Sequence, residues 1–119
     1  MSLIQDILVG SIVLVQFPFT NLQTEKKRPV LVLHCFSLKE NLQIFTCSMI
    51  TSKMEAITME GDTLLKDWEQ SGLLNPSLLR LSKMATLESN LICRELGKIS
   101  KRDHREVQKN FSKIFKDWI

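Results

Sequence analysis

Three short groups of polar residues stand where the sequence predicts that buried strands begin or end. Each group combines arginine, lysine or hydroxyl side chains: they are Glu25–Arg28, Thr51–Lys53, and Arg80 with Ser82 and Lys83. Arginine offers a planar fork of donors, hydroxyls offer neutral donors and lysine adds positive charge, which together suit a phosphate group. Because Glu25 adds a carboxylate, these groups could support metal-free phosphodiester chemistry by general acid–base catalysis.

Apolar runs beside the first two groups predict the strands that would position them. Gly10–Phe17 and Leu42–Ile50 are rich in β-branched and other apolar residues, which is typical of strands. Pro29 fixes its own φ and favours extended geometry at Arg28, so a strand over Val30–Cys35 should begin sharply there. The intervening segment Pro18–Lys27 lacks hydrophobic periodicity and is predicted to be an exposed loop.

The middle of the chain gives weaker signals. Leu64, Leu65 and Trp68 fall at helical spacing before Gly72, so a short helix is predicted over Thr63–Ser71. Three further short strands are predicted around this helix, at Ala56–Met59, Leu78–Leu81 and Ala85–Leu87.

The C-terminal segment carries the clearest pattern. Ser100 followed by Asp103 resembles a capping box, which marks a helix start. Apolar residues then recur at helical spacing, at Val107, Phe111, Ile114, Phe115 and Trp118. The other face is basic, with Lys101, Arg102, Arg105, Lys109 and Lys113. We therefore expect an amphipathic helix over Ser100–Ile119 that packs on the strands through its apolar stripe.

Composition restricts the class of protein. The 119 residues, 44% apolar and 24% charged, suit one globular domain over residues 1–119. No apolar run is long enough to span a membrane, and a net charge of +3 permits a polyanionic partner. Cys35, Cys47 and Cys93 are widely spaced and odd in number, which argues against disulfides and a zinc site and fits a reducing cytoplasm. No cofactor or metal site is predicted.

Five blocks of sequence, in order, resemble the PemK/MazF family of toxins from type II toxin–antitoxin modules. They are GSIVLVQFPFTNL, KKRPVLVL, SMITSK, SGLLNPSLLRL and LGKIS. The resemblance implies a mainly β fold with helices, an SH3-like (CcdB/PemK-type) antiparallel β-barrel, often a homodimer. It further implies a growth-inhibiting, metal-independent endoribonuclease that cleaves single-stranded RNA (mRNA). The expected protein partner is a small cognate antitoxin that covers the RNA-binding groove.

The resemblance also assigns roles to single residues. Arg28 matches the family's catalytic arginine, and Thr51 matches its catalytic threonine. Arg80 falls where some members have a second arginine that acts as acid and phosphate ligand. Ser82 stands where those members have an aspartate, and Gly10–Ser11 replaces the usual Gly-Asp pair.

The remaining candidates surround these residues. Glu25 is the leading candidate for the general base, with His34 or water as alternatives. The residues expected to contact RNA are Lys26, Lys27, Ser52, Lys53, Ser82, Phe19, Thr20 and Asn21. The competing hypothesis is a non-catalytic family member that binds RNA, the antitoxin or another protein, such as a topoisomerase, without cleaving RNA.

Overall fold

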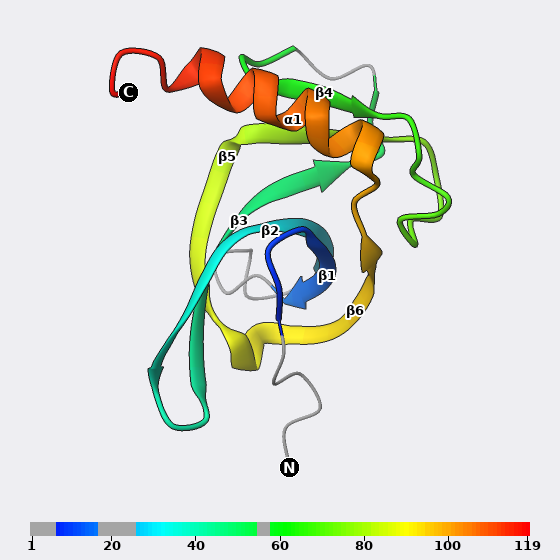
Figure 1. Cartoon of the computed structure of the whole chain (residues 1–119). Coiled ribbons are helices and arrows are strands. Elements are labelled where there is room, and N and C mark those ends of the chain that lie inside the picture. Colours follow the sequence, from blue (N-terminus) through cyan, green and yellow to red (C-terminus); the bar gives the residue numbers. More distant parts are fainter. Residues whose placement is uncertain (1–6, 17–25, 55–57) are drawn as a thin grey trace.

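Six antiparallel strands form one sheet, and a C-terminal helix packs against it (Figure 1). The computed structural model describes residues 7–16, 26–54 and 58–119. Its elements are β1 Ser11–Gln16, β2 Lys27–Lys39, β3 Leu42–Thr51, β4 Asp62–Leu65, β5 Ser77–Glu88, a 3₁₀ turn at Ser89–Leu91, β6 Ile92–Lys98 and α1 Lys101–Ile114. The order in the sheet is β4-β5-β3-β2-β1-β6, and every neighbouring pair is antiparallel.

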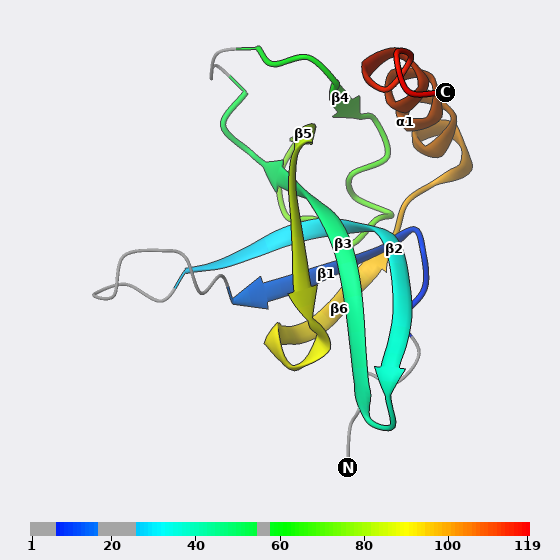
Figure 2. The same ribbon diagram turned by 90° about the vertical axis from the view of Figure 1, so that its left-hand side faces the viewer.

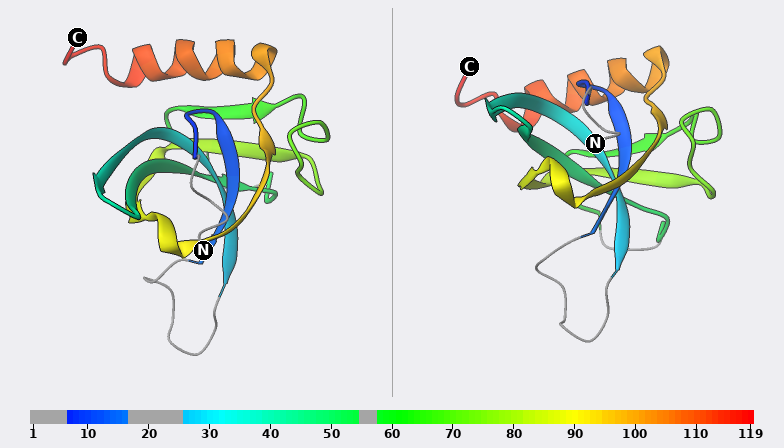
Figure 3. Two further views of the ribbon diagram at one scale, coloured as in Figure 1. Left: turned by 60° about the horizontal axis from the view of Figure 1, so that its bottom comes forward. Right: turned by 90° about the horizontal axis from the view of Figure 1, so that it is seen from below.

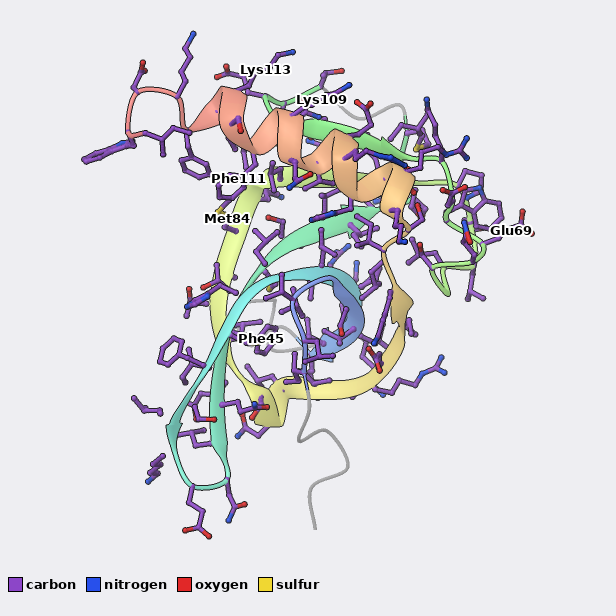
Figure 4. The ribbon with its side chains drawn as sticks, viewed as in Figure 1. Phe45, Glu69, Met84, Lys109, Phe111 and Lys113 are labelled. Carbon is purple, nitrogen blue, oxygen red and sulfur yellow. The ribbon has the colours of Figure 1, made fainter. Side chains whose placement is uncertain are left out.

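Both faces of the sheet are buried in its central part, which explains the continuous apolar runs in the sequence. Val30 and Val32 of β2 belong to one core cluster, together with Phe45 of β3. Leu31, between them, belongs to a second cluster that also contains Val107 of α1. The sheet curls around the first cluster, so that Phe45 lies inside the curl (Figure 4), while α1 covers the second.

The first three predicted strands are confirmed as β1, β2 and β3. Strand β2 is longer than expected, because it continues to Lys39 and forms a hairpin with β3 (Figure 2). The predicted strands Leu78–Leu81 and Ala85–Leu87 are parts of the single strand β5. The mainly β, antiparallel fold is as predicted, but the sheet is not closed into a barrel. In the described part of the chain β4 and β6 are its two edges.

The predicted helix over Thr63–Ser71 is wrong. Its first residues form β4, which pairs with β5 from Asp62 opposite Arg80 to Leu65 opposite Ser77. Turns follow as far as Gly72. Pairing with a long neighbouring strand satisfies the backbone of this short segment better than an isolated helical turn would, since short helices are marginal. The predicted strand Ala56–Met59 is also wrong where it is described, at Thr58 and Met59; its first two residues lie outside the described residues.

The C-terminal helix is confirmed, and it begins as predicted. The hydroxyl of Ser100 accepts a hydrogen bond from the backbone N–H of Asp103 at 3.1 Å, which caps the helix. Val107 is buried, but Phe111 is 40% exposed and Trp118 lies beyond the helix with 88% exposure. The apolar stripe therefore packs on the sheet only in part. Figure 4 shows Lys109 and Lys113 on the side of α1 away from the sheet.

The C-terminal helix lies on the outer side of the curled sheet (Figure 3). In both views of Figure 3 the helix lies along β4, outside the curl. None of the helices within the described ranges is long and apolar enough to cross a membrane.

Candidate active site

Arg28 and Thr51 lie at the same end of two neighbouring strands. The ladder between β2 and β3 ends where Val30 pairs with Met49, so Arg28 precedes this last pair by two residues on β2 and Thr51 follows it by two on β3. Beyond that pair the two strands diverge (Figure 2). Both residues, which were predicted from separate parts of the sequence, nevertheless line one pocket.

Pro29 shapes this end of the sheet. It pairs with Leu14 of β1, whereas the ladder between β2 and β3 begins only at Val30. Because proline has no backbone N–H, it cannot donate a ladder hydrogen bond. The strands β2 and β3 are thus unpaired at the point where Arg28 and Thr51 stand, which leaves space between their ends.

A pocket with a volume of about 450 Å³ occupies this space. Among the predicted site residues, Lys27, Arg28, Thr51, Ser52 and Lys53 line it. Four apolar residues of the strands also line it, and we call them the floor: Leu14, Pro29, Ile50 and Leu96. The segment from Gly72 to Asn75 and Ser77 also line it, and we call them the wall; Arg94 of β6 is a further lining residue.

The charge of the pocket is of one sign. Its described lining contains four cationic side chains, those of Lys27, Arg28, Lys53 and Arg94, and no carboxylate. Uniform positive charge around a partly enclosed, low-dielectric space attracts anions. Hydroxyl and amide groups at Thr51, Ser52, Asn75 and Ser77 add neutral hydrogen-bonding groups.

The hydroxyl of Thr51 is oriented by the turn that follows β3. Its Oγ1 accepts a hydrogen bond from the backbone N–H of Lys53 at 3.1 Å. A hydroxyl has one proton to donate and can accept at its oxygen. Because Oγ1 already accepts the hydrogen bond from Lys53, the hydroxyl proton of Thr51 points away from that N–H. It can be donated to an anion in the pocket.

Arg80 lies near this pair but does not line the pocket. It is opposite Met49 on β3 and so is diagonal to Thr51 on the same face of the sheet. Its side chain is only 10% exposed, and its Nη2 lies 3.9 Å from Oδ2 of Asp62 on β4. Arg80 is thus held in an ion pair, at a position diagonal to Thr51.

Several other predicted residues are placed away from the pocket or are not described. Lys26 is exposed just before β2 and does not line the pocket. The hydroxyl of Ser82 donates a hydrogen bond to the carbonyl oxygen of Glu60, also outside the pocket. Glu25 and the predicted loop residues Phe19, Thr20 and Asn21 lie outside the described residues.

The structure removes His34 from the candidate bases. It is six residues from Arg28 on the same strand, a separation of about 20 Å at roughly 3.3 Å per residue. It is exposed, and its ring lies against that of Phe36 with centroids 5.7 Å apart.

The wall of the pocket is fixed by contacts to β6 and α1. Gly72 packs directly on the backbone of β6 at Leu96. The preceding turn, which carries Glu69, lies beside the first turn of α1 (Figure 4). There the buried carboxylate of Asp103 accepts hydrogen bonds from the backbone N–H groups of Lys66 at 3.0 Å and Asp67 at 2.8 Å.

Asp67 completes this attachment. Its carboxylate accepts hydrogen bonds from the hydroxyl of Ser100 at 2.6 Å and from Nη2 of Arg102 at 2.6 Å. The hydrogen bond from Arg102, followed by that from Ser100, lowers the pKa of Asp67. The C-terminal helix thus holds one wall of the pocket through two aspartates.

Sequence reasoning missed Arg94 and Asn75. Neither lies in one of the three polar groups, and the strand that carries Arg94 was not predicted at all. The sequence signal for Asn75 was its turn, Asn-Pro-Ser, which is common in loops that have no function. Only the pairing of β6 with β1 brings Arg94 to the pocket, opposite Leu14.

Comparison with solved structures shows that the fold is MazF-like. Its backbone superposes on an endoribonuclease in complex with its cognate antitoxin from a Mycobacterial species, with a TM-score of 0.67 at 10% identity over 93% of this chain and 96% of that one. The Mycobacterium tuberculosis toxin MazF-mt6 gives a TM-score of 0.65 at 19% identity, over 89% and 96% of the two chains. At such low identities these similarities establish the fold alone.

The family follows from the sequence profile of the PemK-like, MazF-like toxins of type II toxin–antitoxin systems, which matches residues 9–115. The chain belongs to this family. A search of curated proteins found no significant match.

Proposed function

We propose that this protein is the toxin of a type II toxin–antitoxin module and a metal-independent endoribonuclease that cleaves single-stranded mRNA and inhibits growth in the cytoplasm. The observation that carries the proposal is that Arg28 and Thr51 line one pocket whose described charged residues are all cationic, with no carboxylate among them. The apolar floor beside these cationic residues suits a nucleotide, which combines a flat base with an anionic phosphate.

The proposed reaction uses the 2′-hydroxyl of the RNA as its nucleophile. A bond forms between the 2′-oxygen and phosphorus while the bond from phosphorus to the 5′-oxygen breaks. Arg28 holds the non-bridging oxygens, and Thr51 donates a hydrogen bond to the same phosphate; such donors stabilise charge that develops in the transition state. The products are a 2′,3′-cyclic phosphate and a 5′-hydroxyl.

Two proton transfers complete the reaction. A base removes the proton of the 2′-hydroxyl, and Arg28 or a water molecule protonates the leaving 5′-oxygen. The described lining of the pocket contains no carboxylate that could be this base. The candidate bases are therefore Glu25, which lies outside the described residues, and water. Arg80, which is paired with Asp62 and lies diagonal to Thr51, would add positive charge near the phosphate.

No metal enters this scheme. Within the described ranges, no three His, Cys, Asp or Glu side chains come together as a metal site would require. The decisive experiment incubates the purified protein with a long single-stranded RNA in EDTA and maps the ends. We expect cyclic phosphate ends and no cleavage of DNA or of a substrate with a 2′-deoxy sugar at the cut. Cleavage of the 2′-deoxy substrate, or a strict magnesium requirement, would refute the mechanism.

We further propose that the toxin forms a homodimer and is inhibited by a cognate antitoxin. One of the similar folds is that of an endoribonuclease solved with its antitoxin, which supports a partner of this kind. Exposed apolar side chains, among them Val9, Phe36, Leu38 and Met84, supply surface for such contacts. Light scattering at tens of micromolar should report a dimer; a strict monomer would contradict the dimer but not the nuclease.

Ser82 favours a second candidate function. Where some relatives have an aspartate, this chain has a hydroxyl that is bonded to the backbone of Glu60, outside the pocket. A family member without that acid could bind RNA or the antitoxin and not cleave. RNA binding without new ends in the mapping experiment would support this non-catalytic alternative.

A further inference from the structure

The pocket lined by Arg28 of the inner strand β2 is also lined by a second arginine, Arg94 of the edge strand β6. Arg94 of β6 is opposite Leu14 of β1, which in turn is opposite Pro29 of β2. Neighbouring strands lie about 4.8 Å apart, so the strand of Arg94 is about 10 Å from the strand of Arg28. Both arginines line the same pocket, and β1, which contributes Leu14 to the lining, lies between their strands.

The floor and wall between the arginines match the chemistry of a nucleobase. Leu14 and Leu96, which are partly exposed, offer apolar surface to the face of a ring. Asn75 stands on the wall and is exposed, and its amide has both donors and an acceptor for the edge of a base. The backbone around it is fixed, since its carbonyl oxygen accepts a hydrogen bond from the hydroxyl of Ser77 at 2.7 Å.

We propose that this part of the pocket is a subsite for the nucleotide adjacent to the scissile phosphate. The base of that nucleotide lies on the apolar floor and is read by Asn75, and Arg94 binds its far phosphate. The inference rests on the proposed function for the position of the cut, but the binding of single-stranded nucleic acid can be tested without cleavage.

The test for Arg94 measures the affinity of a fully 2′-deoxy single-stranded oligonucleotide by fluorescence anisotropy at several salt concentrations. We expect Arg94→Ala to weaken binding about tenfold, as expected for a lost charge-assisted hydrogen bond. The slope of log K against log salt should fall by about 0.7, since one phosphate contact is removed. The matched control is Lys98→Ala, which removes an exposed cation of the same strand that does not line the pocket.

The test for Asn75 measures base preference at the position next to the cut, with a panel of oligonucleotides that differ there. We expect Asn75→Ala to change the preference at that position by at least about fivefold and to leave other positions unchanged. Asn90→Ala, an exposed amide outside the pocket, is the control. Circular dichroism establishes that each variant is folded.

The outcomes separate this subsite from the proposed nuclease. If the wild type cleaves RNA but Arg94→Ala has the affinity and salt slope of Lys98→Ala, the subsite is refuted and the nuclease stands. An unchanged base preference in Asn75→Ala would likewise refute base reading. If the wild type does not cleave, the salt slope of Arg94→Ala still decides whether the phosphate contact exists.

Discussion

Gly72 and Leu96 are in direct backbone contact, since a Cβ placed on Gly72 would lie 2.0 Å from the carbonyl oxygen of Leu96. Gly72 also has a φ of +87°, a conformation that costs residues with a side chain about 1–2 kcal/mol. This contact joins the wall of the pocket to β6, which carries Arg94. The geometry of the pocket therefore depends on a residue that has no side chain.

Gly72→Ala should destabilise the protein by more than the cost of its φ angle, because backbone must also move. Gly10→Ala is the matched control: Gly10 has a φ of +94°, and its Cβ would meet only a side-chain methyl of Ile99 at 3.6 Å. We expect a loss of about 1–2 kcal/mol for Gly10→Ala and a clearly larger loss for Gly72→Ala in urea unfolding. Equal losses in the two variants would show that the backbone contact is unimportant.

Arg28→Ala and Thr51→Ala should each lower the rate of RNA cleavage on the order of 10²–10³-fold, because each removes a donor to the phosphate. Both residues are at the rim, so the variants should remain folded by circular dichroism. Thr51→Ser should keep most of the activity, since it keeps the hydroxyl. Lys98→Ala, which removes an exposed cation outside the pocket, serves as the control. Wild-type cleavage by Arg28→Ala would refute the assignment.

Glu25→Ala distinguishes the two candidate bases. A large loss of activity, together with loss of the acid limb of the pH–rate profile, would identify Glu25 as the base. A wild-type rate would mean that water, and not Glu25, removes the proton of the 2′-hydroxyl. The measurement is the pH dependence of cleavage under single-turnover conditions.

Asp103→Asn should cost about 1–3 kcal/mol of stability, because an amide can accept with only one oxygen and leaves one buried backbone N–H without its partner. The two N–H groups belong to Lys66 and Asp67, which precede the wall of the pocket. Arg102→Ala, which removes the exposed ion pair with Asp67, should have a much smaller effect. Denaturant unfolding of both variants measures the difference.

Acid should weaken the attachment between α1 and the wall. The pKa of Asp67 is lowered in the folded protein by Arg102 and Ser100. Its contribution to stability is therefore present above the unfolded pKa and is lost as the pH falls through the folded value, that is, below about pH 4. Thermal melts should show a decrease in Tm over this range that is smaller in Asp67→Asn. An identical decrease in both proteins would contradict this role.

The cysteines should differ in reactivity. Burial raises the pKa of the Cys47 thiol to about 12, whereas Cys93 is exposed. At pH 8 iodoacetamide should modify Cys93 rapidly and Cys47 only after unfolding, because the thiolate is the reactive form. Mass spectrometry of the labelled peptides checks this order. Fast labelling of Cys47 in the native protein would mean that the core around Phe45 opens readily.

The sequence by itself predicted the first three strands, the C-terminal helix and the family. Each of these features is encoded locally: apolar β-branched runs predict strands, and Ser100 with Asp103 marks the helix start. The family resemblance also pointed to Arg28 and Thr51, whose roles stay predictions. What these signals share is that the deciding residues lie within a few positions of one another.

Only the tertiary structure decided the identity of β4, the open edges of the sheet and the second half of the pocket. Leu64, Leu65 and Trp68 have the spacing of a helix, but the segment pairs with β5 because a strand some fifteen residues ahead offers hydrogen bonds. Arg94 reaches the pocket only because β6 pairs with β1, from the other end of the chain. Such contacts depend on strand order and register, which local hydrophobic patterns do not specify.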